Sequence, residues 1–505
     1  MHRKKYESVD TYGVDNNTFY SLDEERGGGS IIFEDIMNNT LTTTTESESA
    51  DKGKIKSQLI LMLTSFICSV VVGIGVAFTS PFLNNLIKMD LLNNKTSPMY
   101  TSFLTIGCIF GGPLAGKFSN KYGRKPTIIL IILLMTYCWF LTIISEYFPI
   151  RWAYIVLYLS RFLIGCALSM ILLILPVYMN ECIHERIRGT FGYSIGLGIS
   201  FGILTTYLVG SFISWQYTSM LAILMLVPAI LFTLYIPESP RWLIRHNEVD
   251  KSMEVLMWLR NSKQTAIEEQ NKILHSLAVQ NKTDGFWSKF RTIKNPYLLK
   301  NIMACLCIHA IQQFSLINVF ISYSSEIFIT AGYTNTQFPL IFIGFVQMLS
   351  SIFSAFFIDR FGRRPLILIS SVLVILSLMS MGFYFHLKSF SILNDSHTWI
   401  IVLFVSFYII SFCMGINQIP WIMLSELLIS NIQDELCSIV TLINRLISLF
   451  VVLSYPYLTQ ITSKYNILYI FAVLCSIILS VVVFTLPETK NICLEDIKKK
   501  NDSKD

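Results

Sequence analysis

NKYGRKP, at residues 120–126, returns in altered form as DRFGRRP at residues 359–365. Two more motifs recur in the same order: PVYMNE at 176–181 returns as PWIMLSE at 420–426, and PESPR at 237–241 returns as PETK at 487–490. The three separations are 363 − 124 = 239, 426 − 181 = 245 and 488 − 238 = 250 residues. A nearly constant separation indicates a duplicated chain whose two halves share one topology.

The composition places this chain in a membrane. Hydrophobic residues make up 53% of it and charged residues 14%, whereas soluble domains carry about 25% charged residues. Segments of about 20 apolar residues can cross the hydrocarbon layer as helices. The sequence therefore predicts an all-α, multi-pass membrane protein with twelve transmembrane helices in two six-helix halves, in the plasma membrane or an intracellular organelle membrane. The predicted spans are 58–83, 99–118, 126–145, 152–176, 191–212, 216–236, 299–325, 336–358, 365–387, 398–424, 434–457 and 465–486.

Basic residues gather on alternate connections between the predicted spans, around residues 52–56, 117–125, 186–188 and 360–364. The positive-inside rule places these connections, and both termini, in the cytoplasm. The net charge of +6 reflects this topology, so we expect no nucleic-acid partner.

The predicted parts of the chain differ in polarity. The N-terminal residues have too few apolar side chains to form a core and predict a disordered tail. In the polar middle segment, EVDKSMEVLMWLR and AIEEQNKILHSLAV have the spacing of amphipathic helices. The predicted parts are a cytoplasmic tail at 1–55, a first six-helix half at 56–236, a cytoplasmic linker with short helices at 237–298, a second six-helix half at 299–487 and a short cytoplasmic tail at 488–505.

The repeated motif brings charges of opposite sign to one level of the membrane. Its glycine suits a tight turn, and its proline can start the next helix. Acidic residues of both halves lie at the same level. We expect ion pairs that hold the cytoplasmic helix ends together and break when a cavity opens inward. The predicted cytoplasmic latch comprises Arg124, Glu181, Arg188, Glu238, Asp359, Arg363, Arg364, Glu426 and Glu488.

The eleven cysteines do not predict a metal site or a disulfide framework. Most fall inside predicted spans and none forms a CxxC pair, so we interpret them as small apolar packing residues. The sequence has no nucleophile, metal-ligand or phosphate-loop pattern either. We therefore expect no enzyme activity, no metal and no cofactor.

The repeated motifs, together with RFLIG (161–165), QQFSLIN (312–318) and IPW (419–421), resemble those of the sugar porter family of the major facilitator superfamily, which includes the facilitative glucose transporters. The resemblance covers residues 58–497 and implies a transporter of hexoses or related polyols that works by alternating access. Gln347 and FTSP, at residues 78–81, are similar to the class III branch of that family. The motifs that carry the resemblance are GRK and GRR, RFLIG (161–165), PVYMNECIHERIRG (176–189), PESPRWL (237–243), QQFSLIN (312–318), IPW (419–421) and PETK.

The resemblance implies a set of substrate-binding residues in the second half. Carboxamides suit this task because each offers a donor and an acceptor to a sugar hydroxyl. The seventh span also carries a polar stripe of Gln312, Ser315, Asn318, Ser322 and Ser325. The implied substrate-binding residues are Gln312, Gln313, Asn318, Gln347, Trp421 and Asn444.

Several positions depart from the family's pattern. The family's glutamine in the fifth span falls on Gly196, and the glycine of its QQLSGIN falls on Leu316. Its GPGPIPW reads GINQIPW at 415–421, and the tryptophan that follows the asparagine of the eleventh span is Arg445. These departures favour transport in general over glucose in particular.

Arg445 interrupts an apolar span, where a cation costs about 2.5–3.5 kcal/mol by insertion scales. It shares a helical face with Ser438, Thr441 and Ser448, which we expect to line the cavity. Three interpretations are open: Arg445 donates hydrogen bonds to a neutral sugar or polyol, it binds an anionic organic substrate, or it bonds only to neighbouring helices. We count it among the candidate substrate-binding residues.

The first span predicts the mode of transport. Its segment VVVGIGVAF, at residues 70–78, lacks the carboxylate that is typical of proton-driven sugar porters, which favours facilitated diffusion. His309 is the candidate proton site, with a buried neutral histidine as the alternative. Other possible functions are a proton-coupled sugar symporter and a non-transporting nutrient sensor. We expect a sugar or polyol and the lipid bilayer as partners, and a monomer.

Overall fold

The computed structural model describes residues 54–93, 96–184, 188–280, 296–394, 397–428 and 433–487, and all of its regular elements there are helices. Twelve segments are long and apolar enough to cross a membrane, which confirms the predicted number of spans. The predicted tails 1–55 and 488–505 lie outside the described residues, apart from residues 54 and 55. The helices are α2 (Ile55–Ala77), α3 (Thr79–Lys88), α4 (Ser97–Tyr122), α5 (Arg124–Ile144), α6 (Ile150–Cys182), α7 (Arg188–Phe212), α8 (Trp215–Tyr235), α9 (Pro240–Arg245), α10 (Val249–Leu259), α11 (Lys263–Gln280), α13 (Pro296–Phe314), α14 (Ile317–Thr330), α15 (Gln337–Phe361), α16 (Arg363–Ser389), α17 (Trp399–Met414), α18 (Ile419–Leu427), α19 (Gln433–Ile461) and α20 (Lys464–Thr485), with a 3-10 turn at Ser145–Tyr147.

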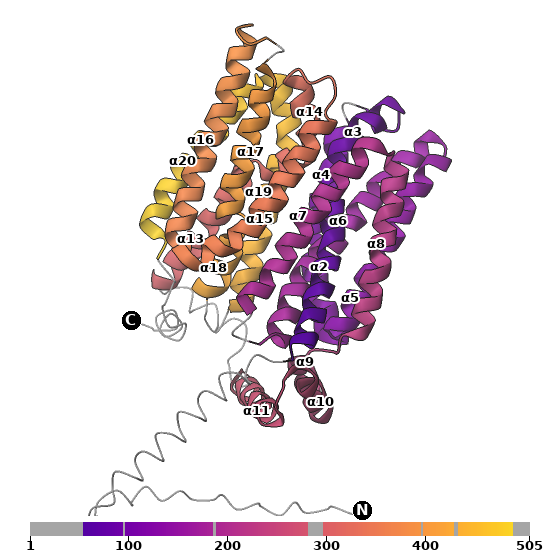
Figure 1. Cartoon of the computed structure of the whole chain (residues 1–505), viewed down its shortest axis with the longest axis vertical. Coiled ribbons are helices and arrows are strands. Elements are labelled where there is room, and N and C mark those ends of the chain that lie inside the picture. The colour runs from indigo at the N-terminus through magenta and orange to yellow at the C-terminus, as the bar shows by residue number, and fades with distance from the viewer. Residues whose placement is uncertain are drawn as a thin grey trace, which may run out of the picture. The chain divides into compact units, whose positions relative to one another are not determined.

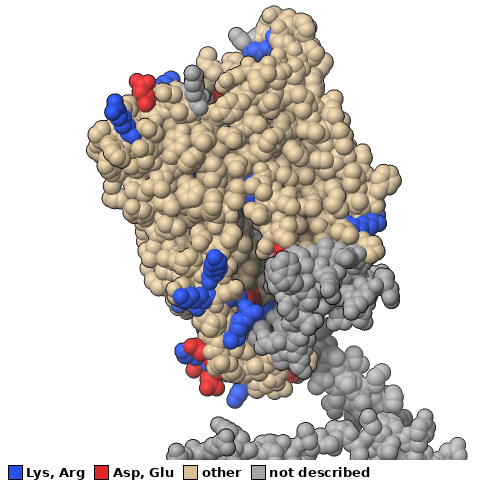
Figure 2. Space-filling view, turned by 180° about the vertical axis from the view of Figure 1, so that it is seen from behind, with Lys and Arg blue, Asp and Glu red and all other residues tan. Residues whose placement is uncertain are grey.

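Helices α2–α8 pack against one another, and α13–α20 form a second group (Figure 1). The two groups meet along α7 with α15 and along α4 with α19. Close packing within the first group depends on glycine: a Cβ on Gly73 of α2 would lie 2.1 Å from the Ile199 carbonyl oxygen of α7. Small residues let membrane helices approach in this way. On the face drawn in Figure 2, most charged side chains lie toward the two ends, with a largely uncharged band between them.

Three predicted spans are each divided into two helices. The first breaks at Phe78, because Pro81 has no N–H to donate to the carbonyl of Ala77. The tenth breaks at residues 415–418, between α17 and α18, and Pro420 lies in the first turn of α18. The seventh breaks between α13 and α14, so its polar stripe does not lie on one continuous helix, contrary to the prediction.

The break in the seventh span places Leu316 in the left-handed backbone region, with φ of 69°. This conformation costs a residue with a Cβ about 1–2 kcal/mol. The leucine side chain is fully buried, so packing around it offsets the backbone strain.

The three short helices of the linker are held to the ends of α2 and α6. The Lys54 ammonium, the Ser57 hydroxyl and the Gln58 amide donate to the carbonyls of Met257, Trp258 and Leu259. Arg260 donates to the carbonyl of Cys182 at 3.1 Å and forms a two-bond ion pair with Glu269. Figure 1 shows α9, α10 and α11 at one end of the first group, which we call the linker end.

The turn of NKYGRKP lies at the linker end, between α4 and α5. Gly123 has φ of 103°, and a Cβ there would lie 2.3 Å from a carboxylate oxygen of Glu238. The same carboxylate accepts hydrogen bonds from the backbone amides of Arg124 and Lys125. The glycine is therefore needed twice, for its backbone conformation and for the space beside it.

Gly123→Ala is expected to lower the free energy of unfolding by about 1–3 kcal/mol from backbone strain alone, with a further loss from displacing Glu238. Gly116→Ala on α4 is the matched control, because a Cβ there meets no atom within 4 Å. The control should be neutral or stabilising by up to about 1 kcal/mol. Thermal unfolding of the detergent-purified protein measures both effects, and equal melting temperatures would show that this turn does not require glycine.

Candidate functional site

The break in the tenth span creates a backbone acceptor inside the membrane region. Pro420 has no N–H, so the carbonyl of Ile416 has no helical partner four residues on. Gln312 of α13 donates its amide to that carbonyl at 3.0 Å and to the Asn417 carbonyl at 3.1 Å. A buried side-chain amide thus satisfies the backbone groups that the break leaves free.

A chain of carboxamides continues from Gln312 across the second group. Asn444 of α19 donates to the Gln312 oxygen at 3.3 Å and accepts from the Gln313 amide at 3.2 Å. Asn318 of α14 donates to the Gln313 oxygen and to the Ser448 hydroxyl, both at 2.8 Å. Four of the predicted residues, Gln312, Gln313, Asn318 and Asn444, therefore form one connected group, which we call the amide network.

The amide network has two possible roles. It links α13, α14, α19 and the break between α17 and α18 by buried and partly buried hydrogen bonds, as polar residues between membrane helices commonly do. Its bonds are also of the kind that a sugar hydroxyl can replace one for one, since each hydroxyl both donates and accepts. The geometry is compatible with both roles at once.

Arg445 lies one residue beyond Asn444 and faces Trp421. Its guanidinium carbon is 5.7 Å from the centre of the Trp421 ring, a distance suited to a cation–π contact. It forms no hydrogen bond or ion pair with any other described residue, and its Nε is buried without a partner. The interpretation that Arg445 bonds only to neighbouring helices therefore has no acceptor within the described part of the chain.

His309 also contacts Trp421: the two rings are nearly perpendicular, and their centres are 5.2 Å apart. Its Nδ1 is 2.9 Å from the carbonyl of Cys305, and a carbonyl can only accept, so Nδ1 carries the hydrogen. Its Nε2 is buried and has no partner among the described residues. These contacts fit a buried, neutral histidine.

Gln347 lies apart from the amide network. It is on α15, 8% exposed, and its side chain makes no hydrogen bond to a described residue. Its neighbours on the same helical face, Gly344 and Ser351, contact α7: Ser351 bonds to Ser200 at 2.7 Å, and a Cβ on Gly344 would meet Leu204. Gln347 thus lies where α15 meets the first group.

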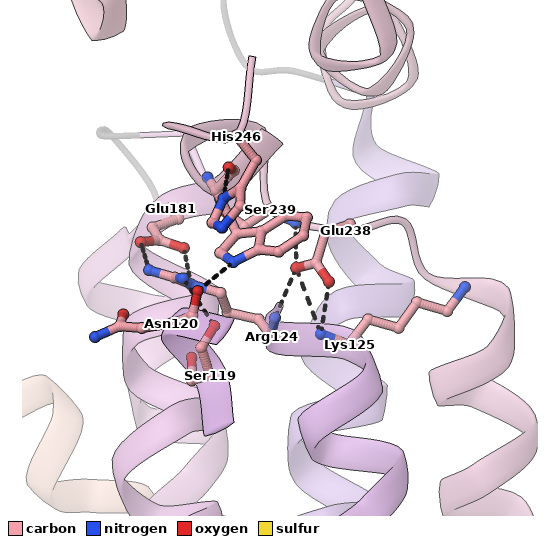
Figure 3. Close-up of polar contacts among 9 residues, drawn as sticks. Ser119, Asn120, Arg124, Lys125, Glu181, Glu238, Ser239 and His246 are labelled. Carbon is pink, nitrogen blue, oxygen red and sulfur yellow. Dashed lines mark hydrogen bonds and ion pairs between the residues drawn. The ribbon is translucent and has the colours of Figure 1, made fainter. Parts of the chain in front are cut away.

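The predicted latch residues of the first half come together at the linker end (Figure 3). Arg124 donates through Nε and Nη2 to the two oxygens of Glu181, at 2.9 and 2.8 Å, and both side chains are nearly buried. Its Nη1 donates to the carbonyl of Ser119 at 3.3 Å. A two-bond pair of this kind is among the stronger hydrogen-bonded contacts in proteins.

Glu238 lies beside this pair and binds backbone rather than arginine side chain. Its oxygens accept from the amides of Arg124, Lys125 and Ser239 at 2.8–3.1 Å (Figure 3). Burial raises the pKa of its carboxyl above the ordinary value, although those amides and the Arg124 charge act in the opposite direction. Glu238 therefore anchors the turn of NKYGRKP.

The second half repeats these contacts with less burial. Arg363 pairs with Glu426 at 3.2 Å, with side chains 25% and 16% exposed against 8% and 9% for Arg124 and Glu181. Arg364 donates to the Val483 carbonyl near the end of α20, as Lys125 does to Leu234 near the end of α8. Of the other predicted latch residues, Arg188 and Asp359 lie on described helices without described side chains, and Glu488 lies outside the described residues.

Arg161 is the most deeply buried charged side chain among the described residues of the first group, and its role was not predicted from the sequence. It is 1% exposed and donates to the Gly75 carbonyl at 2.8 Å and to the Thr79 hydroxyl. The faces of Phe78 and Tyr100 lie 5.8 and 5.6 Å from its guanidinium carbon. A lone arginine in a predicted span was the available signal, the same signal that identified Arg445.

Comparison with known proteins independently supports the resemblance to sugar porters. The family described as Sugar (and other) transporter matches residues 36–500. The facilitated trehalose transporter Tret1 of Bombyx mori is 28% identical over 92% of both chains, and that of Drosophila virilis is 28% identical over 88% of this chain and 49% of its own length.

A solved structure shares the fold. The xylose transporter XylE from E. coli, in a partially occluded inward-open conformation, superposes with a TM-score of 0.73 at 20% identity, over 87% of this chain and all of its own. The family match covers most of the sequence, including every span and both copies of the repeated motif. The chain therefore belongs to the family of sugar (and other) transporters, which are membrane transporters rather than enzymes.

Proposed function

We propose that this protein carries sugars or related polyols across a membrane by facilitated diffusion, through alternating access between its two six-helix halves. The amide network carries the proposal, because it presents interchangeable donors and acceptors at the two breaks, in the seventh and tenth spans, that give the backbone freedom to move. We further propose Gln312, Gln313, Asn318, Gln347, Trp421, Asn444 and Arg445 as the substrate-binding residues.

Hydrogen bonds between the two halves support a conformation that is closed at the end opposite the linker. Tyr207 of α7 donates to the carbonyl of Ile321 on α14 at 3.0 Å. Gln337, at the start of α15, donates to the carbonyl of Ser211, and the amide of Ser325 donates to Ser80 of α3. These few hydrogen bonds would exchange with water when that end opens.

The surroundings of Arg161 support facilitated diffusion over proton coupling. Its partners are a carbonyl, a hydroxyl and two aromatic rings, none of which takes up a proton near neutral pH. His309 is the remaining candidate, but its burial disfavours the charged form, and its Nδ1–H donates only to the neutral carbonyl of Cys305. A coupled transporter needs a group whose charge changes during the cycle.

The charge pattern supports further proposals about orientation and assembly. The linker end would face the cytoplasm, with both termini on that side, and the chain would act as a lipid-embedded monomer. There the ion pairs Arg124–Glu181 and Arg363–Glu426 would act as the latch, together with Glu238 and Arg364. The five parts of the chain would be the tail 1–55, the halves 56–236 and 299–487, the linker 237–298 and the tail 488–505.

Uptake of radiolabelled D-glucose, D-xylose, trehalose and myo-inositol into proteoliposomes tests the function. We expect at least one sugar to enter until its inside and outside concentrations are equal. An imposed pH gradient should leave that final level unchanged. Accumulation above the outside concentration would contradict facilitated diffusion, and no uptake of any compound alongside intact, folded protein would contradict sugar transport.

Gln313→Ala removes the central member of the amide network. We expect KM for the transported sugar to rise by about tenfold, the equivalent of one hydrogen bond of roughly 1.4 kcal/mol. Asn301→Ala is the control, because the Asn301 amide is on the same helix, α13, and also bonds to another helix, at the carbonyl of Leu427, away from the network. If both variants changed KM equally, the network would have only a packing role.

Arg445→Gln keeps a hydrogen-bond donor but removes the charge. If the guanidinium donates to a neutral sugar, the KM of the variant for that sugar should rise. Anionic sugar acids should then compete for uptake neither in the wild type nor in the variant. Competition by glucuronate in the wild type that disappears in the variant would favour an anionic substrate instead. Unchanged KM and competition, in a variant that inserts normally, would exclude substrate contact by Arg445.

A further inference from the structure

Gln418 reaches from the second half to the first. It belongs to the break between α17 and α18, immediately after the two carbonyls that accept from Gln312. Its amide nitrogen lies so close to Gly196 of α7 that a Cβ on that glycine would be 2.5 Å from it. Gln418 is therefore a side chain of one half that covers the backbone of the other.

Gly196 differs from two later glycines of α7, Gly198 and Gly202. A Cβ on Gly198 or Gly202 would meet the backbone of α2, within the same half. A Cβ on Gly196 would meet only the Gln418 side chain. The missing side chain at this position thus serves the contact between the halves rather than the packing within one.

The Gln418 carboxamide has no hydrogen-bond partner among the described residues. Gly196 offers it only helical backbone, whose N–H and carbonyl groups are already used along α7. An amide that has no partner in the protein is available to water or to a ligand. Its atoms remain accessible, at the edge of the amide network.

We propose that Gln418 is a further sugar-binding residue, and that Gly196 is required because only glycine leaves room for its amide. The inference rests on the proposed sugar transport and extends the amide network to the face of α7. A sugar bound there would bridge the halves, accepting from or donating to Gln418 while it contacts the network through Gln312. Binding of the sugar to Gln418 and Gln312 would thereby be linked to the approach of the two halves.

Three variants test the proposal: Gln418→Ala, Gly196→Ala and the double variant. The probe is the sugar among D-glucose and trehalose that the wild type carries. Gln418→Ala should raise KM by about two- to tenfold, the range for one neutral hydrogen bond. Gly196→Ala should raise it similarly by displacing the amide, and the double variant should show no further rise, because both changes remove the same contact.

A spacer role for Gln418 gives the opposite pattern. Gln418→Ala alone would then leave KM unchanged, and it would restore wild-type KM when combined with Gly196→Ala, because it relieves the clash. Either result would overturn the proposal while leaving sugar transport by the wild type intact. Absence of transport in the wild type would instead contradict the proposed function.

Competition by the monodeoxy derivatives of D-glucose gives a readout that does not require Gly196→Ala to fold. If Gln418 binds one hydroxyl, a single derivative should inhibit wild type and Gln418→Ala equally, while D-glucose inhibits the variant about two- to tenfold more weakly. Equal weakening for D-glucose and every derivative would show an indirect effect on the site and would overturn the proposal.

Discussion

The need to satisfy every backbone polar group without water governs this structure. A helix does so within itself, and any break inside the membrane must be compensated by side chains. The tenth span breaks where Pro420 leaves the Ile416 carbonyl without a partner, and Gln312 supplies the missing donor. Because Gln312 then needs a partner for its own oxygen, Asn444 follows, and Gln313 and Asn318 after it. The hydrogen-bonded amides at the centre of the second half thus follow from the one N–H that Pro420 lacks.

Apolar length was enough to predict the twelve spans, and the set of short motifs was enough to predict the family, because both can be read from short stretches of sequence. The breaks were harder to predict. Pro81 and Pro420 are visible in the sequence, yet proline also occurs inside unbroken helices such as α8, at Pro228. At Leu316 the one signal was the glycine that the family carries at this position, because leucine itself rarely adopts a left-handed backbone and does so here under tertiary packing.

The residue types of the site came from the resemblance and from polar spacing, but their partners depend on contacts between distant spans. The sequence placed Arg445 on a polar face, whereas its contact with Trp421 requires α18 to begin where it does. The surroundings of Arg161 and Gln418 were not predicted for the same reason: Arg161 is enclosed by α2 and α4, and Gln418 lies over a helix more than 200 positions earlier in the chain. Composition cannot reveal either neighbour.

The attachment of the linker helices has an evolutionary consequence. Lys54, Ser57, Gln58 and Arg260 each donate to a main-chain carbonyl on the opposite partner. A main-chain carbonyl is present whatever the side chain, so the residues that accept these hydrogen bonds can be substituted while the bonds are retained. The outer faces of α10 and α11 can therefore diversify, and acquire new binding partners, without disturbing the transmembrane helices that they cover.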